Sequence, residues 1–290
     1  MPQVPEEWTV LSMIKWGTAY FEEKKVPSPR LSIEWLLADV LQMRRLDIYL
    51  QFERPLSEDE LSGLRDKIKR RLKHEPLQYI VGHTEFMHAH LRVTPDVLIP
   101  RPETERLVES AMERLSAESS CNVLDIGTGS GCIAIALKMD RPGWDIYAID
   151  ISESALEVAR ENAALNAADV TFLGGDLFLP ESFMAKLPGK LDLIVSNPPY
   201  IPGEERPDID REVRDYEPEI ALFTDNLRGI YTSLKHIGET VLKKGGYLLV
   251  EIHEDYGNEL MKLFEKSKWK TSLLRDYNDK NRIICGLYKG

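Results

Sequence analysis

The sequence predicts an α/β protein in which a small helical domain precedes a mostly parallel, seven-stranded sheet. After Pro95, short apolar runs alternate with helical patterns, which is typical of a parallel sheet with right-handed crossovers. The last two apolar runs have no helical pattern between them and indicate an antiparallel hairpin at the sheet edge. Before Pro76, apolar residues recur at helical spacing instead. A chain of 290 residues can hold both parts.

Residues 1–75 are expected to form a helical bundle. The first helix is predicted at Glu6–Lys25, and Ser28-Pro29 has the pattern of an N-cap and first-turn proline for Leu31–Gln42. Ser57 and Glu60 fit a capping box that opens a helix to about Lys73. We interpret the basic residues of that helix as a solvated face, with a docking surface as the alternative: Arg65, Lys67, Lys69, Arg70, Arg71 and Lys73.

Residues 76–95 are expected to form a β-hairpin linker. Glu85-Phe86-Met87 and Leu91-Arg92-Val93 flank a short polar stretch. His83, His88 and His90 lie close together there, but no cysteine or carboxylate set accompanies them. We therefore interpret them as loop histidines and predict no metal site.

Residues 96–290 are expected to form the sheet domain, beginning with a helix at Glu103–Leu115. The predicted parallel strands are Asn122–Ile126, Ile146–Ile149, Val170–Leu173, Leu191–Val195 and Tyr247–Ile252. The helices between them are predicted at Cys132–Met139, Ser154–Asn166 and Leu227–Leu242. The closing hairpin is predicted from Trp269–Leu274 and Arg282–Tyr288.

Composition excludes several classes of protein. The chain is 43% hydrophobic and 29% charged, and no apolar run approaches the roughly 20 residues of a membrane span. The first residues lack the pattern of a signal peptide. Cys121, Cys132 and Cys285 form no C-x-x-C pair, which favours reduced, buried thiols in a cytoplasmic protein.

The net charge of −11 lies entirely in residues 81–290, which hold 24 Lys and Arg against 35 Asp and Glu. A protein that binds duplex nucleic acid usually has a basic footprint. The charge therefore argues against a nucleic-acid partner.

A glycine loop follows the first predicted strand, in the run Val123 to Cys132. Gly127, Gly129 and Gly131 have the spacing G-x-G-x-G, with Thr128 and Ser130 between them. Glycines at a strand-to-helix turn let the backbone approach a ligand. The loop alone is weak evidence, because many tight turns look alike.

Two acidic residues follow the next two strands. Asp150 lies 19 residues after Gly131, where a carboxylate can accept both ribose hydroxyls of a nucleoside; the alternative is an N-cap for the helix beginning near Ser152. Asp176 could accept the adenine amino group, with Leu177 and Phe178 as an apolar wall, or it could be a turn aspartate. No Walker lysine or basic cluster accompanies the loop, which favours S-adenosylmethionine, an adenosine ligand without phosphates.

Asn197-Pro198-Pro199-Tyr200 follows the fourth strand, at the edge where such sheets react. The Asn197 side-chain oxygen and the Pro198 carbonyl could accept both hydrogens of a planar amino group, and Tyr200 could stack on its face. Holding both N–H bonds orients a poorly nucleophilic nitrogen toward a methyl donor. The alternative is a rigid proline turn.

These segments resemble class I S-adenosylmethionine-dependent methyltransferases, a Rossmann-like fold. Together with Ile99-Pro100-Arg101-Pro102-Glu103-Thr104-Glu105 and the helical domain, the chain is similar to the HemK/PrmC family of protein-(glutamine-N5) methyltransferases. That resemblance implies methylation of the Gly-Gly-Gln glutamine in class I peptide chain release factors, with S-adenosyl-L-homocysteine as product. It implies a cytoplasmic enzyme of translation termination, without a nucleic-acid or membrane partner.

The resemblance also implies the roles of individual residues. Arg101 and Glu103 are expected to hold the linker, and Phe86 either lines the glutamine slot or belongs to the hairpin core. Residues 1–75 are expected to dock the substrate. The implied cofactor-binding residues are Gly127, Thr128, Gly129, Ser130, Gly131, Asp150, Asp176, Leu177 and Asn197. The implied substrate-binding residues are Asn197, Pro198, Pro199, Tyr200 and Phe86, of which Asn197 and Pro198 are catalytic.

Three other functions remain open from the residues. A ribosomal-protein glutamine is an alternative substrate for the same chemistry. An adenine-N6 nucleic-acid methyltransferase shares the N-P-P-Y loop, but it predicts a basic groove or a target-recognition domain. A silent S-adenosylmethionine-binding module would not need Asn197.

Overall fold

The computed structural model describes residues 2–116, 120–265 and 268–290 and divides the chain into two compact units. The helical unit runs to Gly82 and takes in Asp210–Tyr216, and the sheet unit holds His83–Ile209 and Glu217–Gly290. These bounds differ from the expected 1–75, 76–95 and 96–290. Helix α4 (Leu77–Val81) packs with helices α2 and α3, whereas the hairpin packs on helices of the sheet unit.

The helical unit contains α1 (Val10–Glu23), α2 (Pro29–Val40), η1 (Asp47–Leu50), α3 (Glu58–Arg71), α4 and α9 (Arg211–Tyr216). The predicted capping box is confirmed, because Glu60 N–H donates to Ser57 Oγ and Ser57 N–H donates to Glu60 Oε2. Ser28 is the N-cap of α2 and Pro29 lies in its first turn, as predicted. Ser28 has a φ of 47°, and its side chain makes no capping hydrogen bond.

Arg71 corrects the expectation that the whole basic run of α3 is solvated. Only 3% of Arg71 is exposed, and its guanidinium donates to Ser32 Oγ and to the carbonyls of Glu75 and Pro27. It also pairs with Glu212 of α9 at 2.8 Å. A cation that is this deeply buried needs such partners, so Arg71 is a structural residue of the helical unit.

Seven strands of the described residues form the sheet, in the order β5-β4-β3-β6-β7-β9-β8. Strands β3 to β7 are parallel, whereas β9 is antiparallel to both β7 and β8. The predicted closing hairpin is therefore confirmed, with its second strand inserted beside β7. The bounds are β3 Asn122–Ile126, β4 Asp145–Asp150, β5 Val170–Gly174, β6 Leu191–Ser196, β7 Leu242–Glu251, β8 Trp269–Arg275 and β9 Asn281–Tyr288.

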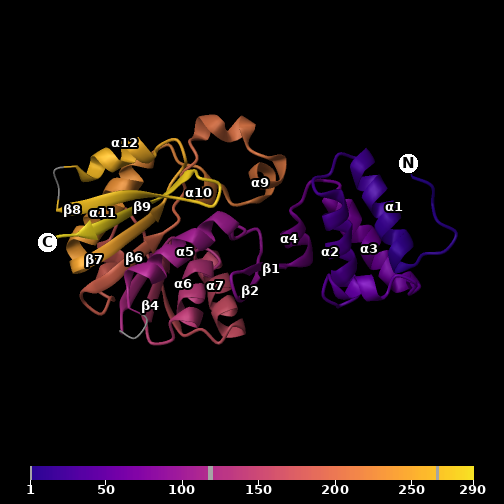
Figure 1. The fold of residues 1–290 in the computed structure, drawn as a ribbon, viewed down its shortest axis with the longest axis horizontal. Helices are drawn as coiled ribbons and strands as arrows, with labels where there is room; N and C mark the ends of the chain where they lie inside the picture. Colours follow the sequence, from indigo (N-terminus) through magenta and orange to yellow (C-terminus); the bar gives the residue numbers. More distant parts are fainter. Residues whose placement is uncertain (1, 117–119, 266–267) are drawn as a thin grey trace. The chain divides into compact units, whose positions relative to one another are not determined.

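Helices cover both faces of this sheet (Figure 1). The core of one face contains Val123 and Leu193 with α5 and α6, and the core of the other contains Leu124 and Ile194 with α11. Neighbouring strand residues thus point to opposite cores, as the alternation of a strand requires. The long helices are α5 Pro102–Arg114, α6 Cys132–Asp140, α7 Glu153–Leu165 and α11 Leu227–Val241.

The sequence did not predict the short helical segments of the sheet unit. They span six residues or fewer, which is too short for a helical period to be read from the sequence. Their bounds are α8 Glu181–Met184, η2 Gly203–Asp208, α10 Glu219–Leu222, α12 Gly257–Met261 and η3 Lys262–Phe264.

The hairpin of β1 (His83–Phe86) and β2 (Ala89–Arg92) is confirmed, and two asparagines of the α7 region hold it. Asn162 bonds both the N–H and the carbonyl of Arg92, and Asn166 does the same for His90. Asn162 also donates to the carbonyl of Ser130 at 2.9 Å. The hairpin is therefore tied through one buried side chain to the glycine loop.

None of the described helices is long and apolar enough to cross a membrane. Cys121 and Cys285 are buried thiols outside any disulfide, as expected, whereas Cys132 is only partly buried.

Candidate active site

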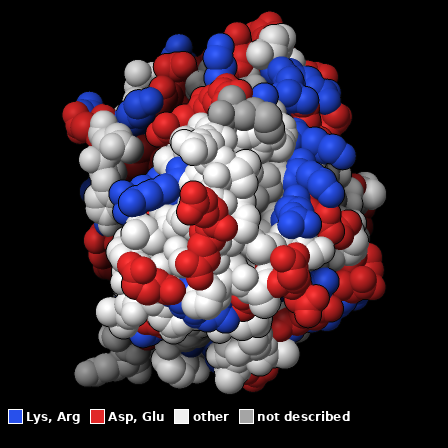
Figure 2. Space-filling view, turned by 90° about the vertical axis from the view of Figure 1, so that its right-hand side faces the viewer, with Lys and Arg blue, Asp and Glu red and all other residues white. Residues whose placement is uncertain are grey.

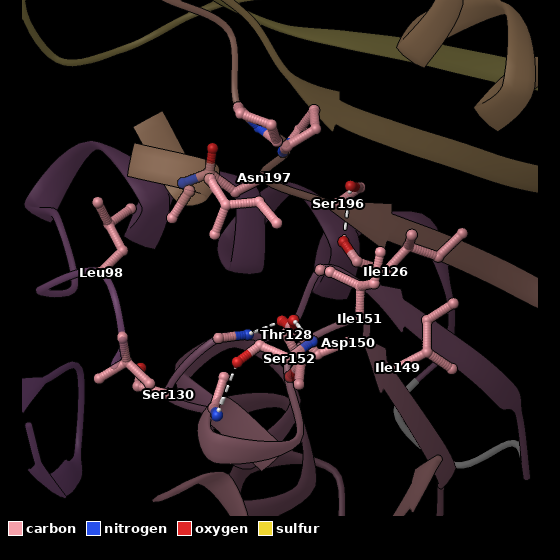
Figure 3. A pocket seen from close by; sticks show the side chains of 18 of the residues that line it. Leu98, Ile126, Thr128, Ser130, Ile149, Asp150, Ile151, Ser152, Ser196 and Asn197 are labelled. Carbon is pink, nitrogen blue, oxygen red and sulfur yellow. Dashed lines mark hydrogen bonds between the residues drawn. The ribbon is translucent and has the colours of Figure 1, made fainter. Parts of the chain in front are cut away.

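A cavity of about 270 Å³ opens at the carboxyl ends of β3, β4, β5 and β6 (Figure 3). Its walls come from the loops that follow these strands, together with residues 96–101 before α5, Thr104 in the first turn of α5, and residues 218–221 around α10. Ligands of open α/β sheets bind at this position, because the order in which successive strands are added to the sheet reverses there, which leaves a crevice. The fold thus brings the glycine loop, Asp150, Asp176 and Asn197 to one cavity.

Hydrogen bonds fix the conformation of the glycine loop. Thr128 Oγ1 donates to buried Asp125 Oδ2 at 2.6 Å. Gly129 N–H donates to Asp150 Oδ2 at 2.8 Å, and Figure 3 labels Thr128 and Asp150 side by side at the cavity. Gly127, Gly129 and Gly131 have φ values of 74°, 53° and 83°, in the left-handed region that favours glycine. The loop is therefore a backbone wall of the cavity that its own hydrogen bonds hold in place.

Asp150 does not cap α7, which removes the structural alternative for this residue. The N-cap is Ser152, whose side chain accepts from Ala155 N–H. Asp150 Oδ1 accepts from Ser152 N–H at 2.9 Å, so the two carboxylate oxygens hold one backbone N–H each. Burial raises the pKa of Asp150, while these N–H groups oppose the shift. Each oxygen keeps further acceptor capacity for a ligand hydroxyl.

Asp176 has the geometry of a turn aspartate. Its Oδ1 accepts from Phe178 N–H at 2.8 Å, and residues 176 and 179 form an isolated bridge. Asp176, Leu177 and Phe178 nevertheless line the cavity. A contact from Asp176 to an adenine amino group stays a prediction.

Two exposed apolar side chains line the cavity near Asp150. Ile151 is 59% exposed and Phe178 is 51% exposed. Large apolar groups facing a cavity are typical of a surface that a flat ligand covers. Phe178 was predicted as part of the apolar wall, whereas Ile151, which immediately follows the strand-ending Asp150, was not.

Asn197 lies in the loop after β6, whose last residue, Ser196, donates from Oγ to the carbonyl of Ile126. Asn197 Nδ2 donates to Thr104 Oγ1 at 3.1 Å. Within the described part of the chain, Asn197 Oδ1 accepts no hydrogen bond. Asn197, Pro198 and Pro199 all line the cavity, so an amide oxygen is available there as an acceptor.

Tyr200 and Phe86 do not line this cavity. The Tyr200 hydroxyl donates to Glu251 Oε1 at 3.1 Å, and only 2% of Phe86 is exposed, within the core around α5. Stacking by Tyr200 on a target amide stays a prediction. A substrate contact by Phe86 also stays a prediction, and the observed burial of Phe86 is that of a hairpin core residue.

Thr104 and Glu251 are functional candidates to which the sequence motifs assign no role. Glu251 ends β7 and is fully buried, and its Oε2 accepts from Thr104 Oγ1 at 2.8 Å. Burial raises the pKa of the Glu251 carboxyl to about 7, opposed by these hydroxyl donors and by Arg282. A carboxylate within the apolar run 247–252 was the available signal, because a buried acid without partners is costly.

Arg101 holds the segment before α5 through Glu217. Its Nη2 lies 2.6 Å from Glu217 Oε1, and Ile99 N–H donates to Glu217 Oε2 at 3.0 Å. Since Glu217 is almost fully buried, this ion pair fixes the cavity wall, much as expected for the linker. The partner of Arg101 lies 116 residues away, which the sequence alone does not indicate.

The sheet fold and its cavity are those of a methyltransferase domain, as comparison with family models shows. Residues 106–213 match the family model described as methyltransferase small domain, and residues 12–82 match the model described as PrmC N-terminal domain. A solved methyltransferase from Pyrococcus furiosus shares the fold, with a TM-score of 0.51 and 17% identity over 70% of this chain and 89% of that one.

Similarity over nearly the whole chain narrows the class. The release factor glutamine methyltransferase of Chlorobaculum tepidum is 43% identical over 96% of this chain and 98% of its own length. The protein of the same name from Geobacter sulfurreducens is 38% identical over 99% of both chains. This chain belongs to the release factor glutamine methyltransferase family, which confirms the resemblance inferred from its motifs.

Proposed function

We propose that this enzyme transfers a methyl group from S-adenosylmethionine to the side-chain amide nitrogen (N5) of the Gly-Gly-Gln glutamine in class I peptide chain release factors. S-adenosyl-L-homocysteine is the second product. The observation that carries the proposal is Asn197, whose Nδ2 is engaged by Thr104 while its Oδ1 is available at the cavity. Since release factors act on the ribosome, the enzyme works in the cytoplasm.

The donor set of the cavity fits S-adenosylmethionine. Asp150 supplies acceptors for ribose hydroxyls, and Leu177, Phe178 and Ile151 supply an apolar wall for adenine. Among the described lining residues Arg101 is the one cation, and it is paired with Glu217. The acidic lining favours a positively charged sulfonium and disfavours phosphates. When bound, this cofactor supplies the electrophilic methyl group.

The residues after β6 fit an amide nitrogen as the acceptor of the methyl group. An amide nitrogen is a weak nucleophile because its lone pair is delocalised into the carbonyl. Asn197 Oδ1 and the Pro198 carbonyl would accept its two N–H bonds, which orients the nitrogen and favours its pyramidal form in the transition state. Proline carbonyls are suited to this role, since Pro198 and Pro199 have no N–H groups to compete.

The helical unit is proposed to help position the release factor. It contains a groove lined by Trp8, Trp16, Tyr20, Arg65 and Lys69 among others. Figure 2 shows uncharged surface bordered by Lys and Arg and interspersed with acidic side chains. Aromatic side chains and arginine are enriched at protein–protein interfaces, which supports this role.

The test is the intact mass of a purified class I release factor after incubation with the enzyme and S-adenosylmethionine. We expect a gain of one methyl group, mapped to the Gly-Gly-Gln glutamine. Asn197→Ala should lower the single-turnover rate by ~10²–10³, as for loss of one preorganised polar group, while cofactor affinity changes little. Asn258→Ala, an exposed asparagine of α12, is the matched control.

A release factor that gains no methyl group would contradict the proposal. Methylation of a ribosomal-protein glutamine or of adenine under the same conditions would redirect it to one of the alternative substrates. Wild-type turnover by Asn197→Ala would leave the N-P-P-Y loop as a rigid turn.

A further inference from the structure

One buried carboxylate is linked to both ends of the N-P-P-Y loop, directly to Tyr200 and through Thr104 to Asn197. Glu251 Oε2 accepts from Thr104 Oγ1, which in turn lies 3.1 Å from Asn197 Nδ2, and Glu251 Oε1 accepts from the Tyr200 hydroxyl. The pairing of Ser196 with Val250 places Glu251 on the strand beside Asn197. Asn197, Thr104 and Glu251 thus form a hydrogen-bonded relay from the cavity into the sheet unit.

The chemistry of Glu251 sets the direction of this relay. An ionised carboxylate can only accept, so the Thr104 hydroxyl must donate its single proton to Glu251. The Thr104 oxygen is then left as an acceptor, and only the Nδ2 side of Asn197 can donate to it. The amide of Asn197 is therefore held with its oxygen free. An asparagine side chain without such a partner could turn over and present its NH₂ group instead.

We propose that Glu251 is a positioning residue that acts through Thr104 to keep the Asn197 oxygen as the group that meets the substrate. The inference rests on the proposed function, because it assigns the selection of an NH₂-bearing side chain to this relay. Glutamine donates two N–H bonds to the free oxygen and the Pro198 carbonyl. Glutamate offers only acceptors there, so it is rejected at the same position.

Other charged groups face Glu251 and enter any pH dependence. Arg282 of β9 lowers the pKa of Glu251, and Glu103 of α5 raises it. The ionisable groups around Glu251 are Arg282, Glu103, Tyr200, Tyr231 and Cys132. Burial also raises the pKa of Asp125 to about 7, so a pH profile of the wild type alone does not identify Glu251.

The first experiment measures single-turnover methyl transfer to a release factor at saturating S-adenosylmethionine. Thr104→Val removes the hydroxyl at nearly constant volume, and we expect the rate to fall roughly 10- to 100-fold, the effect of a lost hydrogen bond to a charged group. Thr104→Ser restores the hydroxyl and should recover most of the rate. Cofactor affinity, measured by calorimetry, should stay within about threefold of wild type for both variants.

The second experiment separates positioning from general structural damage. In Glu251→Gln the side-chain amide can either donate to or accept from Thr104, so the rate should fall. The part of the rate increase through about pH 7 that comes from ionisation of Glu251 should be lost. The variant should also discriminate less between the normal release factor and one with glutamate in place of the target glutamine, measured as the ratio of their dissociation constants. Loss of packing alone would weaken the binding of both release factors equally, without changing the ratio of their dissociation constants.

The outcomes separate this inference from the proposed function. If the wild type methylates the glutamine but Thr104→Val and Glu251→Gln match its rate and its Gln/Glu ratio, the relay has no positioning role. If Thr104→Ser is as slow as Thr104→Val, the hydroxyl is not the active feature and the inference is also wrong. If the wild type transfers no methyl group to glutamine, the proposed function itself fails.

Discussion

Replacing Glu251 by glutamine is expected to stabilise the protein at alkaline pH while it slows catalysis. Glu251 is fully buried, and burial raises its pKa from 4.5 to about 7. The raised pKa means that the native state favours the protonated form. The stability from that protonation is fully present below about pH 4.5 and is lost as the pH rises through about 7. A pKa shift of one unit corresponds to about 1.4 kcal/mol, so the shift of Glu251 from 4.5 to about 7 corresponds to a loss of about 3 kcal/mol in the free energy of unfolding at high pH.

Glutamine has nearly the same shape and carries no charge, so it avoids the cost of ionising a buried acid. The free energy of unfolding of Glu251→Gln, from urea titrations, should therefore match wild type near about pH 5 and exceed it by up to about 3 kcal/mol near about pH 8. Glu259→Gln, an exposed position on α12, gives the baseline for removing one surface charge. A difference between Glu251→Gln and wild type that is the same at both pH values would refute the reasoning.

Three further predictions concern other parts of the chain. Asp150→Ala should weaken S-adenosylmethionine binding at least roughly tenfold by calorimetry, because charge-assisted bonds to ribose are lost; Asp145→Ala, at the other end of β4, is the control, and equal affinities would remove Asp150 from the site. Arg71→Met should destabilise the helical unit by about 3–5 kcal/mol, since it leaves buried partners unpaired. Lys69→Met, which breaks only an exposed pair, should cost less than about 1 kcal/mol, so similar urea midpoints for these two variants would contradict the buried role of Arg71. Gly175→Ala should cost about 1–3 kcal/mol, because its Cβ would lie 2.7 Å from Phe183 Cδ1; a thermal midpoint no lower than that of Gly143→Ala, where no atom lies within 4 Å, would show that the loop adapts freely.

The strands and long helices of the sheet were predictable because their signals are local. Strand β3 was predicted at its observed bounds, and α6, α7 and α11 each differ by one residue at one or both ends. Apolar alternation and helical periodicity arise from the burial of one face, which the sequence records directly. Strand β7 was predicted to begin five residues too late and to end one residue too late, because Leu242 joins the sheet through a bridge to Leu191 past an irregularity.

The candidate site was predictable only for residues whose position follows from the sheet topology and does not depend on a distant side-chain partner. The glycine loop, Asp150 and Asn197 follow strands of one parallel sheet, so topology alone brings them to one cavity. Thr104 and Glu251 are joined by a hydrogen bond although 147 positions separate them in the sequence, and no local sequence pattern indicates such a contact. Arg71 illustrates the same limit, since its burial depends on Ser32 and on Glu212, far along the chain.

The seven residues 210–216 give the helical unit a second attachment to the chain. Within the described residues the polypeptide passes between the units at 82/83, 209/210 and 216/217. The chain enters the helical unit at Asp210, shortly after Tyr200, and returns to the sheet unit at Glu217. The Glu217 carboxylate holds Ile99 and Arg101 at the cavity wall. The helical unit therefore cannot be exchanged or deleted as a simple N-terminal appendage, because a cut at one linker would strip Glu212 and Tyr216 of the residues that they bind. Any exchange of this unit between relatives must carry both segments together.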